Sequence, residues 1–262
     1  MNVNMAVALT EQSATALPKL EPLWHRSAPR SVAESSAADG PIGGWTAWQK
    51  HLAGRKQPVS PPFLAGKQPA LLWGWPLTWQ REQIQSFLAS PTGIESLGST
   101  FALEEIEADD AAANSDLSLA LRFLALAYQL PGLAGKLSAE TWWRLVERLH
   151  ELAGEAQHHR VDWPADPTDA LRQQLLAGEL PLALGYLFPE VRALRALRKS
   201  ARVALSEGLI ELTDGQGLPH ARLLPVLGPL FACWTRARWL GARLGRGPWS
   251  RAAVLQYQWL VR

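Results

Sequence analysis

The chain has 262 residues and a mass of 28.8 kDa, which is enough for one large domain or two small ones with a hydrophobic core. Its single cysteine, Cys233, excludes a disulfide scaffold and a cysteine-rich metal site. No apolar run reaches the roughly 18–20 residues of a membrane span, and the first residues show no secretory signal, so a cytoplasmic location is the default expectation. The formal net charge of +2 conceals a net −6 over residues 1–185 and +8 over residues 186–262.

The first part of the chain is rich in Pro, Gly, Ser and Ala. We expect residues 1–76 to be a partly disordered N-terminal region, with residues 27–44 flexible because they lack a hydrophobic period. A helical domain is predicted over residues 77–262, and its first helix covers residues 77–90. Residues 102–116 are rich in Asp and Glu, and we expect them to form a surface connection.

From about residue 115 the sequence predicts closely spaced helices with short Gly/Pro connectors. The predicted helices cover 117–130, 139–154, 169–178, 182–188, 189 to about 206, 225–243 and 248–262. Gly154, Gly178 and Gly208 are expected to end three of them, and residues 209–217 hold a turn with space for a short strand. Short connectors make successive helices antiparallel, so the predicted fold is all-α and built of helical hairpins.

Basic residues form a stripe on the helix after Pro189, at spacings of three and four: Arg192, Arg195, Arg198, Lys199 and Arg202. One interpretation is a solvated helix face, and the other is a surface that binds sulfate, uronate or phosphate groups. Arginine favours the second interpretation, because its planar fork suits two-point recognition of such anions.

The tryptophans number 13 and most are expected to fill gaps between helices. Trp142 and Trp143 are adjacent and cannot both point into one core, so we expect one of them at a groove, where indole stacks on sugar rings.

The histidines predict no metal site, since His158 and His159 have only Asp162 beside them, and no cofactor motif is present. His220 and Arg222 follow an Asp-Gly turn at Asp214 and stand at the entrance of a helix. They are candidates for a proton acceptor and a carboxylate neutraliser, with a solvated loop as the alternative.

Two stretches, LLAGELPLALGYLFPE with ARVALSEGLIEL, and LTDGQGLPHARLLPVLGPLFACW, resemble the amino-terminal helical region of heparinase II/III-like polysaccharide lyases. The resemblance covers residues 120–262. It implies an incomplete (α/α) toroid whose cleft binds an acidic, uronate-containing polysaccharide and cleaves it by β-elimination. In that reaction a base takes the proton α to the uronate carboxylate while positive groups stabilise the developing charge.

The resemblance extends to Asp214, Gly215, His220 and Arg222 and no further. We expect His220 and Tyr186 to transfer protons, with Tyr128 as a weaker substitute for Tyr186, and Arg222 to neutralise the carboxylate. The expected substrate-binding residues are Arg195, Arg198, Arg202, Trp142, Trp143 and Asp214. The family's cleft helix usually supplies a Tyr or His soon after the turn, where this chain reads LLPVLGPL, and its β-rich second domain has no counterpart here. The sequence is therefore expected to be either the front portion of a longer lyase-like protein or a relative without catalysis.

A different class of function fits the same residues. In this alternative the chain is a non-catalytic helical scaffold that docks an acidic partner, or another polyanion, through its basic face. Nucleic-acid binding ranks third, because the total charge is small and no recognised nucleic-acid-binding module is present, and no membrane partner is expected.

Overall fold

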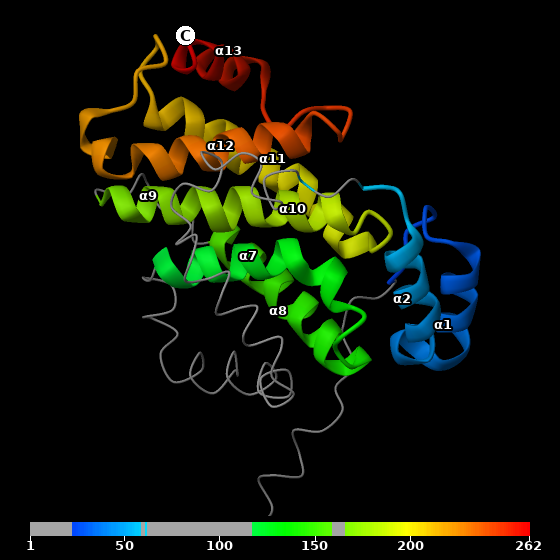
Figure 1. Cartoon of the computed structure of the whole chain (residues 1–262). Coiled ribbons are helices and arrows are strands. Elements are labelled where there is room, and N and C mark those ends of the chain that lie inside the picture. The colour runs from blue at the N-terminus through cyan, green and yellow to red at the C-terminus, as the bar shows by residue number, and fades with distance from the viewer. Residues whose placement is uncertain (1–22, 59–60, 62–116, 159–165) are drawn as a thin grey trace, which may run out of the picture.

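The computed structural model describes residues 23–58, 61, 117–158 and 166–262 (Figure 1). Within these ranges the chain is helical, and its β pairing is limited to two isolated bridges, Trp24 with Val191 and Thr213 with Pro219. The predicted all-α character is confirmed. The expected helix over 77–90 and the acidic connection over 102–116 lie outside the described residues.

The N-terminal part that the structure describes is a helical hairpin, α1 (Arg30–Gly43) and α2 (Trp45–Gly54), drawn in blue in Figure 1. The prediction that residues 27–44 are flexible is wrong. Val32 of α1 is fully buried, and the hairpin turn is tight, since a Cβ on Gly44 would lie 2.1 Å from Ser36 Oγ. Packing against α2 thus stabilises a helix that its own weak hydrophobic period does not predict.

The central part of the fold begins with α7 (Leu117–Leu133) and α8 (Ala139–His158). A longer continuous helix follows, made of α9 (Pro167–Gln173), a π-helical turn η3 (Gln174–Glu179) and α10 (Leu180–Leu187). The predicted stops at Gly154 and Gly178 are wrong, because helix continues through both. None of the described helices has the length and apolar character needed to cross a membrane.

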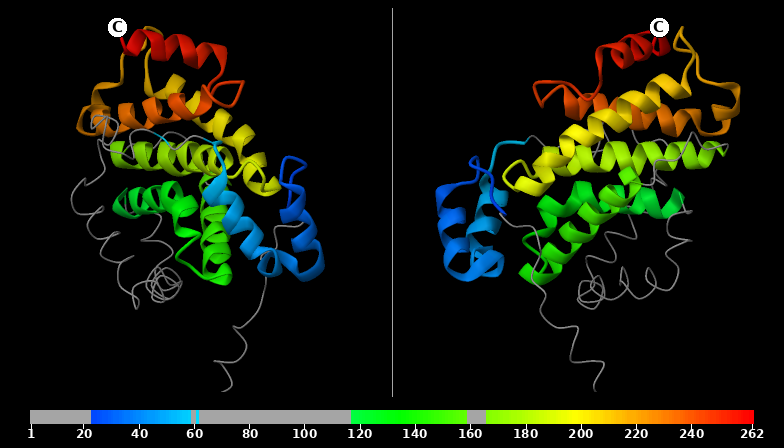
Figure 2. Two further views of the ribbon diagram at one scale, coloured as in Figure 1. Left: turned by 45° about the vertical axis from the view of Figure 1, so that its right-hand side comes forward. Right: turned by 180° about the vertical axis from the view of Figure 1, so that it is seen from behind.

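The C-terminal part starts with α11 (Arg192–Leu212), which lies across α10 and η3, as the rear view in Figure 2 shows. The 3-10 turn η4 (Ala221–Val226), α12 (Leu227–Gly241) and α13 (Arg251–Leu260) complete it. α11 passes the expected stop at Gly208 and ends at Leu212, so residues 209–212 are helical and the suggested short strand is reduced to one bridge.

Glycines allow α11 to lie close to η3 and α10. A Cβ on Gly208 would lie 1.9 Å from Gln174 Nε2, and one on Gly185 would lie 2.9 Å from the Leu194 carbonyl oxygen. These glycines therefore allow two helices to pack closely, and neither of them ends a helix.

A buried ion pair joins η3 to α12. Glu179 and Arg236 are both fully buried, with Arg236 Nε 2.6 Å from Glu179 Oε1 and Nη2 2.8 Å from Oε2. The Tyr128 hydroxyl of α7 donates to Glu179 Oε1 at 2.8 Å. Charges so deeply buried persist only when they are paired and hydrogen-bonded, so this network fixes how three helices meet.

Candidate anion-binding site

Trp142 and Trp143 both lie in the core, whereas the sequence analysis predicted one of them at a groove. Their exposed fractions are 0 % and 1 %, and Trp142 Nε1 donates to the Leu130 carbonyl at 2.9 Å. The two indoles meet edge to face, with ring centroids 4.8 Å apart, so adjacent residues on one helix share a single aromatic cluster. Neither ring has a free face for a sugar, and the expected stacking role is not supported.

This aromatic cluster attaches the α1–α2 hairpin to α8. Trp48 of α2 lies 6.1 Å from Trp142 and 6.4 Å from Trp143, and Trp24 lies 5.0 Å from Trp48, measured between ring centroids. Trp45 contacts Trp142 from the start of α2. The tryptophans therefore position α2 relative to α7 and α8.

The basic stripe on α11 is divided by the fold. Arg198 donates from Nε and Nη2 to the Gly185 carbonyl, and Arg202 donates from Nε and Nη2 to the Trp249 carbonyl at 3.1 and 2.9 Å. Burial, with a further contribution from Arg195, lowers the pKa of Arg198 to about 10. These two guanidinium groups connect α11 to its neighbours, which leaves Arg192, Arg195 and Lys199 to form the solvated face.

Tyr186 and His220, the residues expected to transfer protons, are not brought together. Tyr186 is buried against Trp239, beside Gly185, which contacts Arg198. His220 is exposed and its Nε2 lies 3.0 Å from the Glu211 carbonyl. Arg198 and Glu211 are thirteen residues apart on α11, or about 20 Å along its axis. This separation contradicts a shared role in one proton transfer.

Asp214 and Arg222 lie at the same end of α11 as His220. Asp214 Oδ1 accepts the backbone N–H groups of Gln216 and Leu218, each at 2.8 Å, which holds the turn after α11 in shape. Arg222 is exposed at the start of η4. The alternative interpretation of this segment as a solvated, locally capped loop describes these contacts.

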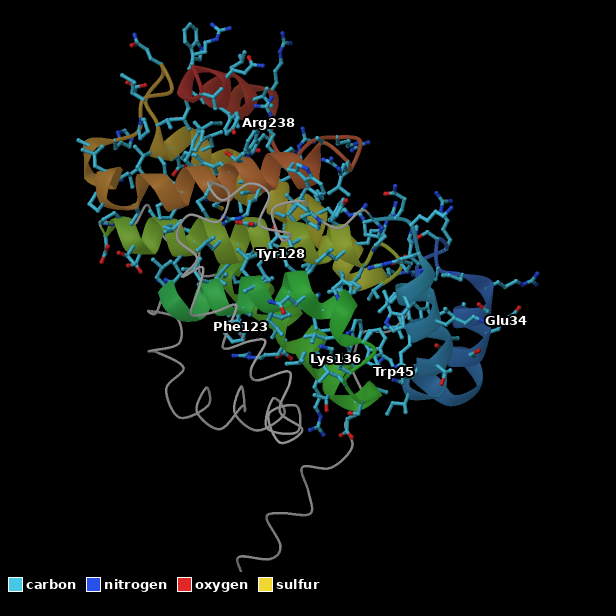
Figure 3. All side chains as sticks on the ribbon, viewed as in Figure 1. Glu34, Trp45, Phe123, Tyr128, Lys136 and Arg238 are labelled. Atoms are coloured by element: carbon cyan, nitrogen blue, oxygen red, sulfur yellow. The ribbon has the colours of Figure 1, made fainter. Side chains whose placement is uncertain are left out.

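A basic groove lies elsewhere, between α2 and the connection from α7 to α8. It encloses about 1110 Å³, and its lining includes the cations Lys50, Arg55, Lys56 and Lys136. Figure 3 labels Lys136 at the α7–α8 connection and Trp45 at the start of α2. No carboxylate side chain is among the described residues that line this groove. The lysines are exposed at its rim and make no ion pair with any residue that the structure describes.

Arg55 differs from these lysines, because its side chain is only 7 % exposed. Its Nη1 lies 3.3 and 3.2 Å from the two carboxylate oxygens of Glu190, and its guanidinium carbon lies 5.7 Å from the centre of the Phe188 ring. Burial lowers the pKa of Arg55 from its ordinary value, and Glu190 opposes that effect. His51 Nε2 lies 2.9 Å from the same carboxylate.

The sequence contains a signal for this groove that the charge balance of residues 1–185 conceals. Residues 40–81 hold five Lys and Arg residues and no Asp or Glu, although the larger segment is acidic. A net charge summed over 185 residues hides a cationic stretch of this length, and only the fold brings Lys136 to it.

The described residues offer no metal centre as an alternative site. Within these ranges, no three His, Cys, Asp or Glu side chains gather in a way that could hold a metal ion. Comparison of the chain with protein-family models, with curated proteins and with solved structures found no match.

Proposed function

We propose that this chain binds an acidic, uronate-containing polysaccharide, and that the basic groove holds it. The observation that carries this proposal is the set of four cations in a groove whose described lining has no carboxylate. A concave site lined by positive charges without nearby negative charges concentrates anionic ligands. The volume of the groove, about 1110 Å³, is slightly above the range of roughly 300–1,000 Å³ for sites that hold small ligands, which suits an extended chain.

The finer parts of the proposal are that the helices belong to an (α/α) toroid and that the bound glycan is cleaved by β-elimination. Both rest on the sequence resemblance to heparinase II/III-like lyases. Tyr128 lines the groove, but its hydroxyl donates to Glu179 and burial raises its pKa well above the ordinary value of 10.0, so it is a poor base near neutral pH. Binding is the part of the proposal that the groove supports.

A non-catalytic scaffold that docks an acidic partner is the second candidate. The separation of Tyr186 from His220 favours it over an enzyme that uses this pair, and the exposed lysines serve an acidic protein as well as a glycan. A cleaving enzyme can be distinguished from a scaffold by its product, because β-elimination forms an unsaturated sugar that absorbs in the ultraviolet and a scaffold forms no product.

The test compares two triple variants that each lose three positive charges. The groove variant is Lys50→Gln with Lys56→Gln and Lys136→Gln, and the matched control is Arg192→Gln with Arg195→Gln and Lys199→Gln on the solvated face of α11. Affinity for oligogalacturonate is measured by calorimetry at low salt and at about 0.15 M salt. We expect the groove variant to lose about threefold to a hundredfold in affinity, from three exposed charges at about 0.2–1 kcal/mol each.

The control variant should bind within about twofold of the unmodified protein. An equal loss in both variants would show attraction to net charge alone, and a larger loss in the control would place the site on α11. Absence of any binding of oligogalacturonate by the unmodified protein would overturn the proposal, and saturable binding of an acidic peptide instead would favour the scaffold. Growth of ultraviolet absorbance during incubation would add cleavage to binding.

A further inference from the structure

The geometry points to Arg55 as the residue that recognises an individual carboxylate of the ligand, with Glu190 as the residue that positions it. This inference rests on the proposed function and assigns different tasks to the cations of the groove. The lysines supply attraction, and Arg55 supplies the directional contact.

The side chain of Arg55 combines burial with open hydrogen-bonding capacity. Although only 7 % of it is exposed, Arg55 lines the groove. Its Nη1 is used by Glu190, whereas Nε and Nη2 make no hydrogen bond with any residue that the structure describes. Nε and Nη2 form the edge of the guanidinium group from which two parallel N–H bonds can meet the two oxygens of one carboxylate.

The carboxylate of Glu190 is held in place before any ligand arrives. Its side chain is only 6 % exposed and lies 2.9 Å from His51 Nε2, and the His51 ring stacks on Trp48 at 5.4 Å. The backbone of Glu190 is fixed as well, because its carbonyl accepts the His25 N–H at 2.7 Å. The aromatic cluster that attaches the hairpin therefore also fixes the partner of Arg55.

This arrangement predicts that Arg55 contributes to affinity in a way that depends little on salt, whereas the contribution of the lysines depends strongly on salt. The Glu190 carboxylate already balances the charge of Arg55, so this guanidinium adds little to the long-range field. Because its side chain is immobilised, however, it loses little conformational freedom when a ligand binds. The exposed lysines have the opposite character, since their charge is uncompensated and their side chains are free.

The first experiment is Arg55→Lys, which keeps the charge and the pairing with Glu190 but removes the planar fork. We expect affinity for oligogalacturonate to fall about tenfold, while the dependence of affinity on salt stays unchanged. The matched control is Arg192→Lys, the same exchange at an exposed position of α11 outside the groove, which should bind within about twofold of the unmodified protein. If Arg55→Lys loses no more affinity for oligogalacturonate than this control does, the assignment is overturned.

The positioning role of Glu190 is tested by a double-mutant cycle. Glu190→Gln should weaken binding severalfold in the unmodified background but have little further effect when combined with Arg55→Lys, because it acts through Arg55. Additive losses would contradict this role. Thermal unfolding of each variant shows whether the fold is retained.

A measurement on the unmodified protein covers the case in which a variant does not fold. The arginine Nε–H signals are followed by NMR during titration with oligogalacturonate and, as a control, with a neutral malto-oligosaccharide. The Arg55 signal should shift with the first ligand only. If oligogalacturonate binds but this signal does not move, or if Arg55→Lys binds like the unmodified protein, the inference is overturned while the groove remains the site; if oligogalacturonate does not bind at all, the proposed function itself fails.

Discussion

The indole of Trp48 in α2 stacks on that of Trp143 in α8, with 6.4 Å between ring centroids and 19° between ring planes. Both side chains are almost completely buried. This contact joins the N-terminal hairpin to the central helices, and it places α2 where Lys50, Arg55 and Lys56 face the connection between α7 and α8. A packing contact between two tryptophans thus positions the helix that forms one wall of the basic groove.

Removal of one of these indoles should destabilise the protein strongly. Trp143→Ala is expected to lower the free energy of unfolding by about 3–5 kcal/mol, because it leaves a large cavity among buried rings. Trp259→Ala is the matched control, since Trp259 is 56 % exposed and its loss should cost no more than about 0.5 kcal/mol. Urea denaturation followed by circular dichroism measures both values, and similar losses would contradict the cluster as a stabilising unit.

The ion pair between Glu179 and Arg236 predicts an unequal cost for single and double replacement. Glu179→Gln should lower the free energy of unfolding by about 3–5 kcal/mol, because it leaves the buried Arg236 charge uncompensated. Replacing Glu179 by Leu and Arg236 by Met together should cost less than the sum of the single replacements. Strict additivity in this double-mutant cycle would show that the pair does not act as a unit.

Two glycines should respond in opposite directions to the same substitution. Gly185→Ala places a Cβ 2.9 Å from the Leu194 carbonyl oxygen and 2.7 Å from Arg198 Cγ, so α10 and α11 must separate at a cost of about 1–3 kcal/mol. Gly154 lies inside α8 with open space where a Cβ would be added, and Gly154→Ala should stabilise the protein by about 0.4–1 kcal/mol. Differential scanning calorimetry compares the two, and a gain at position 185 would contradict the close contact of the helices.

Alkaline pH should destabilise the fold through buried acidic groups. Burial raises the pKa of Tyr128 well above 10.0 and that of the Cys233 thiol well above 9.0. The unfolded chain therefore loses these protons first, and the free energy of unfolding falls as pH rises past about 9 to 10. Arg198, whose pKa is lowered to about 10, has the opposite effect at higher pH, so the comparison must be made between variants.

Tyr128→Phe should reduce the steepness of this decline above pH 10, and Cys233→Ala should reduce it from about pH 9. Urea denaturation at a series of pH values measures each slope. An unchanged slope in both variants would show that other groups dominate the alkaline response.

The amino-acid sequence alone was sufficient to predict that the protein is helical. The period of apolar residues over Ala139–His158 and the capping Asp166-Pro167 pair predict helices that the structure contains. The ends of helices were less predictable. Glycine commonly ends a helix, so Gly154, Gly178 and Gly208 each predicted a stop that the structure does not have. Gly178 and Gly208 instead lie where another side chain occupies the space of a Cβ, and this contact is a property of the packed helices.

The site depended still more on tertiary structure. The sequence places five cations and no carboxylate in residues 40–81, which is a local and readable fact. It does not show that Lys136, from a distant helix connection, completes the groove, or that Glu190 orients Arg55 from more than a hundred residues away. In the same way, the regular spacing of arginines on α11 predicts one basic face. In the structure, however, Arg198 and Arg202 donate hydrogen bonds to the Gly185 and Trp249 carbonyls.

Spacing along a helix therefore determined which side chains share a face, while the neighbouring helices decided which of them remain available to a ligand. Local periodicity follows from the geometry of one helix. Availability depends on burial and on hydrogen-bond partners, and these partners are set by contacts between segments far apart in the chain.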